Sequence, residues 1–289
     1  KAIKQYPDDL NLLYTRAMLA EKRDDMVQLE KDLREALLCN QLHLVYQPQI
    51  DYRNQQIVGV EALIRWHHPE DGIISPGRFI PIAEECGAIL PIGRWVLETA
   101  CRQLAAWDTA GFSVGHVAVN LSAHQFNDPG LTHHLKAVLS DSGLAARRLE
   151  LEVTESTLIN NPTAAIALMT ELKELGVRLS IDDFGTGYSS LAQLKRFPLD
   201  TLKIDRTFVS GIPADASDLA ITEAIIAMAK KLSLSVVTEG VETADQRDFL
   251  ARCGSELIQG YFYSPPLAAE ALHSFSRMFD SDAPPVALT

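Results

Sequence analysis

The chain has 289 residues, 47% of them hydrophobic, which is enough for one large core or for one large domain with a small appendage. Its net charge of −12 argues against a nucleic-acid polymer as a partner, because proteins that bind such polymers usually present a basic face. An anionic substrate remains compatible with this charge if bound cations reverse the local field.

The first part of the chain has a helical pattern. Apolar residues recur at helical spacing over residues 8–39, for example at Leu29, Leu33 and Ala36, with an interruption near residues 22–25. We expect residues 1–40 to form a helical connector without catalytic residues. Because the first residue is Lys1 and not Met, we also expect the chain to be a piece of a longer protein whose upstream regulatory domain is missing.

From residue 42 onward, short apolar runs alternate with amphipathic helices. The expected strands are Leu44–Gln47, Ile57–Ile64, His116–Leu121, Leu149–Val153, Val177–Ile181, Thr201–Ile204, Ser235–Thr238 and Glu256–Ile258. Repeated strand–helix units predict a parallel sheet, and eight of them favour a closed TIM-like (β/α)8 barrel, modified at its first strands. An open doubly wound sheet is the alternative, although no Gly-rich dinucleotide fingerprint follows the first strand.

Three helices between these strands are predicted, two of them from clear end signals and one from its apolar stripe. Residues 162–175 follow Asn161 as N-cap, start with Pro162 and stop at Gly176. Residues 244–253 open with Thr243 and Gln246 in capping-box spacing. Residues 217–232 are expected to bury one stripe, formed by Ile221, Ala224, Ile225, Met228 and Leu232.

Polar residues stand at or near the end of almost every expected strand. Chemistry in a barrel of this kind gathers at the carboxyl ends of its strands. The residues in question are Glu61, Asn120, Glu152, Asp182, Asp183, Lys203, Glu239 and Gln259. So many carboxylates in one cavity need a counter-charge, and oxygen ligands favour Mg²⁺ or Mn²⁺ over zinc, for which thiolate and paired-His patterns are missing.

The segment I-D-D-F-G-T-G, residues 181–187, is the most concentrated of these signals. Asp182 and Asp183 repel each other unless a cation lies between them, and Gly185 and Gly187 allow a backbone to approach a ligand closely. A site for divalent metal and phosphate and a solvated Asp-Asp turn are equally compatible with this segment taken alone.

The motifs together resemble the EAL-domain phosphodiesterases of bacterial cyclic di-GMP signalling. The resemblance runs from about residue 40 to residue 272. It is carried by Y-Q-P at Tyr46–Pro48, E-A-L-I-R-W at Glu61–Trp66, V-N-L-S at Val119–Ser122, E-V-T-E-S at Glu152–Ser156, D-D-F-G-T-G-Y-S-S-L at Asp182–Leu191, L-K-I-D at Leu202–Asp205, E-G-V-E at Glu239–Glu242 and Q-G-Y at Gln259–Tyr261. It implies a barrel at residues 41–275, a tail at 276–289 and hydrolysis of cyclic di-GMP to linear pGpG by two Mg²⁺ or Mn²⁺ ions.

The resemblance also implies a role for each matching residue. Glu61, Asn120, Glu152 and Asp182 match the ligands of one metal, and Asp182, Asp183 and Glu239 match those of the second, with Asp182 bridging. Lys203 matches the lysine that positions the attacking water, Gln259 a residue that supports bound water, and Glu242 the glutamate that holds the loop Asp183–Ser190. Gln47, Leu63 and Arg65 match positions that contact the cyclic dinucleotide.

Two other functions stay open at this point. One is a receptor that binds cyclic di-GMP without hydrolysing it, and the other is a metal-dependent enzyme acting on a different phosphorylated small molecule. The resemblance further implies a homodimer. We expect no signal peptide and no membrane-spanning segment, and hence a cytoplasmic location, either as a soluble protein or as the cytoplasmic portion of a membrane-anchored one. The four cysteines are expected to be buried free thiols.

Overall fold

The computed structural model describes residues 26–185 and 191–279, so the part of the expected helical segment 8–39 that precedes residue 26 lies outside the described residues. Residues 26–36 are helical and bury Leu29, Leu33 and Ala36, as the spacing predicts. None of the described helices is long and apolar enough to cross a membrane.

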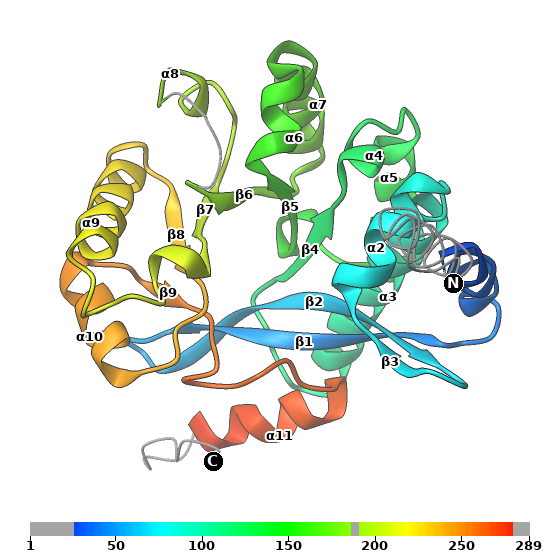
Figure 1. Ribbon diagram of the computed structural model, residues 1–289, viewed down its shortest axis with the longest axis horizontal. Coiled ribbons are helices and arrows are strands. Elements are labelled where there is room, and N and C mark those ends of the chain that lie inside the picture. The colour runs from blue at the N-terminus through cyan, green and yellow to red at the C-terminus, as the bar shows by residue number, and fades with distance from the viewer. Residues whose placement is uncertain (1–25, 186–190, 280–289) are drawn as a thin grey trace, which may run out of the picture. The chain divides into compact units, whose positions relative to one another are not determined.

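Eight strands form a closed barrel (Figure 1). In spatial order they are β2 (Gln56–His68), β4 (Val117–Leu121), β5 (Leu149–Thr154), β6 (Arg178–Phe184), β7 (Thr201–Ile204), β8 (Ser235–Thr238), β9 (Leu257–Ile258) and β1 (Leu42–Asp51), which pairs with β2 again. Seven strands from β2 to β9 are parallel, and β1 runs antiparallel to β9. The expected barrel with modified first strands is therefore confirmed.

Helices follow most of the barrel strands. They are α2 (Pro76–Glu85), α3 (Ile89–Thr109), α4 (Ala123–Phe126), α5 (Leu131–Ser142), α6 (Glu155–Asn160), α7 (Pro162–Leu175), α8 (Leu191–Leu194), α9 (Ala216–Lys231), α10 (Ala244–Cys253) and α11 (Ala269–Phe279), with 3-10 turns η2 (Ala146–Arg148) and η3 (Arg206–Phe208). Local signals set the ends of α7 and α10 where expected. Asn161 Oδ1 accepts a hydrogen bond from Ala164 N, and both halves of the capping box of Thr243 and Gln246 are present.

The chain divides into two compact units. The first contains residues up to His43 and Arg65–Ile92, and the second contains Leu44–Ile64 and everything from Gly93 onward. In the first unit, β2 continues past the barrel and pairs antiparallel with β3 (Gly72–Ile74). Trp66 is fully buried there, because its ring meets Phe79 edge-on at 5.6 Å and its Nε1 donates to Gln41 Oε1 at 2.9 Å.

Two sequence-based expectations about packing are wrong. Helix α9 buries Ile225 as expected, but the rest of its buried face is Thr222, Ile226 and Ala229, so the stripe is rotated and Ile221 and Ala224 are exposed. All four cysteines are free, but only Cys101 is buried and Cys39 is exposed. Both errors concern which face of a helix or turn packs against the rest of the protein. Helical spacing alone does not determine this face when apolar residues occur on several sides of the segment.

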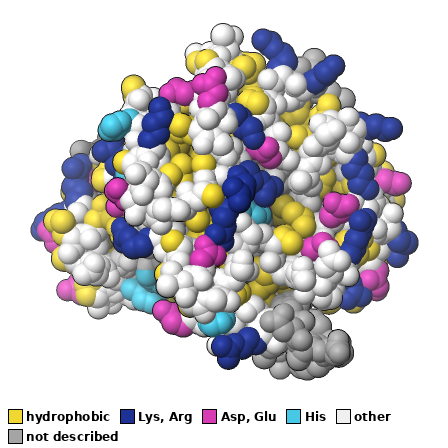
Figure 2. Space-filling model, turned by 180° about the vertical axis from the view of Figure 1, so that it is seen from behind, with side chains coloured by type: hydrophobic (Ala, Val, Ile, Leu, Met, Phe, Trp, Pro, Cys, Tyr) yellow, Lys and Arg dark blue, Asp and Glu magenta, His cyan; other side chains and the backbone are white. Residues whose placement is uncertain are grey.

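Acidic and basic side chains are interspersed over the face of the molecule that Figure 2 shows. Charged side chains near the amino ends of some barrel strands form pairs. Arg178 at the start of β6 lies 2.9 Å from Glu150 Oε2 and donates to Thr201 Oγ1 at 3.2 Å. Lys173 donates to both oxygens of Asp200 at 2.7 Å.

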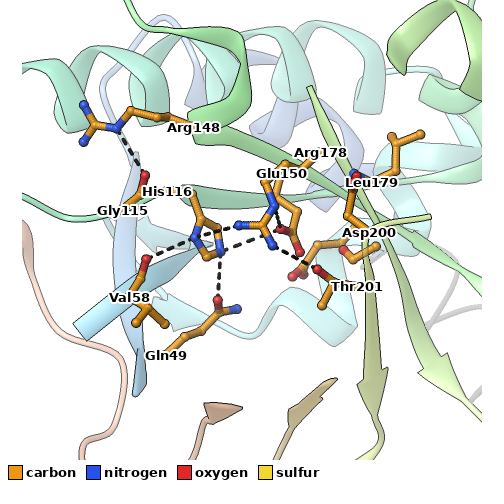
Figure 3. A network of polar contacts seen from close by, with 12 residues as sticks. Gln49, Val58, Gly115, His116, Arg148, Glu150, Arg178, Leu179, Asp200 and Thr201 are labelled. Atoms are coloured by element: carbon orange, nitrogen blue, oxygen red, sulfur yellow. Dashed lines mark hydrogen bonds and ion pairs between the residues drawn. The ribbon is translucent and has the colours of Figure 1, made fainter. Parts of the chain in front are cut away.

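His116 stands at the centre of this polar network (Figure 3). Its Nδ1 lies 3.1 Å from Val58 O, its Nε2 lies 3.0 Å from Gln49 Oε1, and the Glu150 carboxylate and Arg178 guanidinium approach from β5 and β6. Gly59 leaves the room for this ring, since a Cβ there would lie 2.2 Å from His116 Cε1. Burial lowers the pKa of His116, against the raising effect of Glu150.

We expect this histidine to make the fold acid-sensitive. Because its folded pKa is lowered, the unfolded chain binds more protons, so stability is fully present above the unfolded pKa of about 6.5 and is lost as pH falls below it. The loss should reach at most about 1.4 kcal/mol per pH unit. Urea unfolding from pH 7.5 to 5.5 measures this slope. His116→Gln should flatten it and the exposed control His133→Gln should not; equal slopes in the two variants would contradict the assignment.

Candidate active site

The carboxyl ends of the barrel strands bring distant acidic residues around one lysine. Lys203 Nζ, on β7, lies 2.7 Å from Glu152 Oε2 on β5 and 2.7 Å from Glu239 Oε1 just after β8. It also lies 3.2 Å from Asp182 Oδ1 on β6 and 3.5 Å from Glu61 Oε2 on β2. The Lys203 side chain is 1% exposed, so its charge depends on these four carboxylates for compensation.

Glu61 is held on its other side by neutral amides. Asn120 Nδ2 donates to Glu61 Oε1 at 2.6 Å, and Gln259 Nε2 donates to Glu61 Oε2 at 2.5 Å. Gln259 Nε2 also lies 3.2 Å from Gln47 Oε1, whose own amide donates to Ser264 O. Strands β1, β2, β4 and the segment after β9 are thereby tied together at this rim of the barrel.

Asp183 occupies an irregular point of β6. The strand runs three residues beyond its expected end, and its register with β7 shifts between Ile181 and Phe184. Asp183 has a φ of 52°, a backbone conformation that is energetically unfavourable for residues other than glycine. It interrupts the regular alternation of side chains between the two faces of the strand. Strain of this kind is often retained where function needs it. Burial, with Asp182 and Asp205 close by, raises the pKa of Asp183 to about 6.

The acidic cluster carries more negative charge than Lys203 can balance. Four carboxyl groups (Glu61, Glu152, Asp182 and Glu239) contact one ammonium, and Asp183 follows Asp182 on β6, so the five acids would leave four negative charges unbalanced if all were ionised. Burial raises the pKa of Glu152 well above its ordinary value and that of Glu239 to about 8. For Lys203 the acids outweigh burial and raise the pKa of its ammonium, so it stays charged.

The donor set fits divalent cations that prefer oxygen. Glu152 Oε1 and Gln259 Oε1 are buried without a hydrogen-bond partner, and unsatisfied acceptors of this kind suit a cation. Two divalent ions would also balance the four negative charges that remain when all five carboxyl groups are ionised. Within residues 26–185 and 191–279 no three His, Cys, Asp or Glu side chains form a ready ligand set, and the carboxylate oxygens surround the Lys203 ammonium instead.

A cavity of about 270 Å³ opens over this cluster. Its described lining residues are Gln47, Glu61, Leu63, Asp182, Arg206, Glu239, Gly240, Glu242, Gln259, Gly260 and Tyr261. The cavity therefore joins the acidic cluster to Gln47 and Leu63, two of the residues matched to dinucleotide contacts. Arg65, the third, follows Leu63 on β2 and belongs to the first unit.

Comparison with known proteins identifies the family. The EAL domain family matches residues 30–266, which is most of the chain. This chain belongs to the EAL domain family. The cyclic di-GMP phosphodiesterase NbdA of Pseudomonas aeruginosa is 47% identical over 272 residues, which cover 94% of this chain and 35% of NbdA. The cyclic di-GMP phosphodiesterase PdeR of Escherichia coli is 41% identical over 251 residues, covering 87% of this chain and 38% of PdeR.

Solved EAL structures share the fold. The structure of the PaMucR phosphodiesterase in complex with c-di-GMP has a TM-score of 0.82 and 47% identity, covering 85% of this chain and 99% of that one. The FimX EAL domain from Pseudomonas aeruginosa bound to c-di-GMP has a TM-score of 0.75 at 26% identity and covers 85% of this chain and 98% of that one. The EAL domain described here spans little more than a third of the length of the curated relatives NbdA and PdeR.

Several contacts at the rim of this EAL domain were not expected from its sequence. Glu242, matched to a residue that holds the loop after Asp183, pairs with Arg206 at 2.9 Å, and loop residues 186–190 lie outside the described residues. Glu155 Oε2 accepts a hydrogen bond from Gly185 N at 3.1 Å, so this acid supports the first turn of that loop. Tyr261, 63% exposed, lines the cavity. The sequence did contain a signal that could have identified Arg206 as a residue of the site, since it directly follows the L-K-I-D motif.

Proposed function

We propose that this EAL domain hydrolyses cyclic di-GMP to linear pGpG with two Mg²⁺ or Mn²⁺ ions. The observation that carries the proposal is the oxygen-rich acidic cluster around Lys203, which lines a cavity of about 270 Å³ and has more carboxyl groups than one ammonium can balance. A cluster with this charge attracts divalent cations, and such cations in turn attract a phosphodiester. The phosphodiesterase names of NbdA and PdeR point to the same substrate.

Each residue of the cluster has a proposed part in the reaction. Glu61, Asn120, Glu152 and Asp182 would hold one ion, and Asp182, Asp183 and Glu239 would hold the other. When bound, two such ions polarise the phosphate and lower the pKa of the attacking water. Lys203, whose Nζ lies 2.7 Å from Glu239 Oε1, would position that water for attack on the phosphorus, and the 3′-oxygen would leave.

The neighbouring residues would bind and orient the substrate. Gln259, fixed on Glu61, keeps its free Oε1 for a proton of bound water. Gln47 and Leu63 line the cavity and would contact the nucleotide. Arg65 offers a planar fork that can donate two hydrogen bonds to a phosphate. Glu242 is proposed to support the loop after Asp183.

Product analysis after incubation with cyclic di-GMP and Mg²⁺, with and without chelator, tests the proposal. Formation of linear pGpG that stops with chelator is the expected result. Binding without product over hours would make the protein a receptor. Turnover of linear dinucleotides or sugar phosphates in preference to cyclic di-GMP would indicate a different metal-dependent enzyme.

We expect the reaction rate to depend on which divalent ion is supplied. Mg²⁺ and Mn²⁺ should support turnover, whereas Ca²⁺ should be at least about tenfold less effective, because its larger radius and looser coordination shell spoil the spacing of a two-metal site. Initial rates with each ion, after removal of metal by chelation and dialysis, measure the difference. Equal rates with Ca²⁺ and Mg²⁺ would contradict the two-metal assignment.

Other expectations from the sequence stay predictions. They are a homodimer, a cytoplasmic location, an upstream regulatory domain and the division into residues 1–40, 41–275 and 276–289. Helix α11 runs from Ala269 to Phe279, across the last of these boundaries. Light scattering of the purified chain measures the oligomeric state directly.

A further inference from the structure

Arg206 differs in charge from the residues around it in the cavity. Among the described lining residues it is the only Lys or Arg. Four of the others are acids, namely Glu61, Asp182, Glu239 and Glu242. Lys203 lies beneath the cavity and is enclosed by carboxylates, whereas the Arg206 side chain is 63% exposed. The rim therefore offers one accessible cation to an anionic ligand, in addition to whatever ions bind at the floor.

The backbone of Arg206 is fixed by the turn η3. Asp205 caps this turn by accepting a hydrogen bond from Thr207 N at 3.0 Å. The carbonyl oxygen of Arg206 accepts bonds from Val209 N at 3.0 Å and Ser210 N at 2.9 Å. Lys203 lies three residues earlier, near the end of β7. The carboxyl end of this strand therefore positions two cationic side chains, Lys203 in the acidic cluster and Arg206 at the rim.

The side chain of Arg206 is aimed by two further contacts. Its stem passes over Gly240, where a Cβ would lie 2.3 Å from Arg206 Cγ, so only glycine leaves room for it. Gly240 also has a φ of 65°, a conformation that favours glycine. Arg206 Nη2 lies 2.9 Å from Glu242 Oε1 at the end of the stem. One such contact leaves most of the five N–H donors of a guanidinium available.

The chemistry of a cyclic dinucleotide supplies a ligand for these donors. It contains two phosphodiester groups, and the proposed reaction, on which this inference rests, cleaves one of them over the acidic cluster. The second diester keeps its negative charge throughout and enters a cavity whose other described lining residues are neutral or acidic. Planar guanidinium donors match phosphate oxygens in geometry and charge. We infer that Arg206 binds the phosphodiester that is not cleaved and so favours two-phosphate cyclic substrates over simple diesters.

The test compares a substrate that has the second phosphate with one that lacks it. Arg206→Met should raise KM for cyclic di-GMP by about 10- to 100-fold, the loss expected for charge-assisted hydrogen bonds, and leave kcat within about threefold. Hydrolysis of bis(4-nitrophenyl) phosphate, which has one diester, should be unchanged. Arg206→Lys should fall between, because a lysine keeps the charge and loses the fork.

A matched control and a binding measurement complete the test. Arg53 forms a similarly exposed ion pair with Glu256, at 3.1 Å, and neither residue lines the cavity. Arg53→Met should therefore leave KM unchanged both for cyclic di-GMP and for bis(4-nitrophenyl) phosphate. Calorimetry with cyclic di-GMP in Ca²⁺ should show Kd for Arg206→Met raised by the same factor as KM, and this measurement stands even if hydrolysis is absent.

Four results would overturn the inference. Equal losses on both substrates, or a changed Mg²⁺ affinity in a thermal-shift titration, would mean that Arg206 acts through Glu242 on the cluster. If Arg206→Met leaves KM and Kd for cyclic di-GMP unchanged, Arg206 does not contact this ligand. If the wild-type protein binds no cyclic di-GMP, this compound is not its ligand. Wild type that binds cyclic di-GMP but forms no pGpG would refute the proposed hydrolysis alone.

Discussion

Asp182→Asn is expected to lower kcat for cyclic di-GMP by at least about a thousandfold while the protein stays folded. Asp182 is the residue assigned to both proposed ions, so its replacement removes charge from both at once. Lys203 keeps its 2.7 Å contacts with Glu152 and Glu239, which is why the fold should survive the change. Steady-state kinetics together with a thermal melt separate loss of turnover from loss of structure.

The variant should also respond less to metal. We expect the rise in melting temperature produced by Mg²⁺ in the wild type to be largely lost in Asp182→Asn, because a ligand that binds only the folded state stabilises it in proportion to its affinity. Asp141→Asn, at an exposed position on α5, is the control and should behave like wild type. Near-normal turnover in Asp182→Asn would refute the assignment of the metal ligands.

Lys203→Met should cost about 3–5 kcal/mol of unfolding free energy in the presence of chelator, in addition to abolishing turnover. The lysine is fully buried, and its removal leaves Glu61, Glu152, Asp182 and Glu239 facing one another without a counter-charge. Removing one partner of a buried ion pair is costly because the remaining charge has neither water nor a partner. Urea unfolding at pH 7.5 measures the loss.

Two conditions should restore stability to this variant. Lower pH should help because protonation removes the repulsion among the carboxylates, and Mg²⁺ should help because it supplies the missing positive charge. Lys173→Met is a matched control, since Lys173 also lies 2.7 Å from a carboxylate, that of Asp200, but is one-third exposed; it should cost no more than about 1 kcal/mol. A Lys203→Met protein as stable as this control would contradict the view that the lysine holds the cluster together.

Local signals in the sequence were sufficient for most elements of the fold. The N-cap Asn161 and the C-cap Gly176 set α7 at Pro162–Leu175, and the capping box of Thr243 and Gln246 set the start of α10. These features depend on hydrogen bonds between residues within four positions of each other, so a short stretch of sequence contains the whole interaction. The eight strands were found because runs of apolar residues bounded by turns are also local.

The sequence by itself thus determined the eight barrel strands and their order, the positions of α7, α9 and α10, the family, and the acids that stand at the strand ends. Only the tertiary structure decided that β1 runs antiparallel to β9, that α9 buries Thr222 and not Ile221, that Lys203 is surrounded by four carboxylates and that Glu242 pairs with Arg206. The physical reason is that these contacts join residues far apart along the chain. Closure of the barrel joins groups as far apart as Glu61 and Gln259, and the partner of a charge is chosen by distance in space, which the spacing of residues along a strand or helix does not contain.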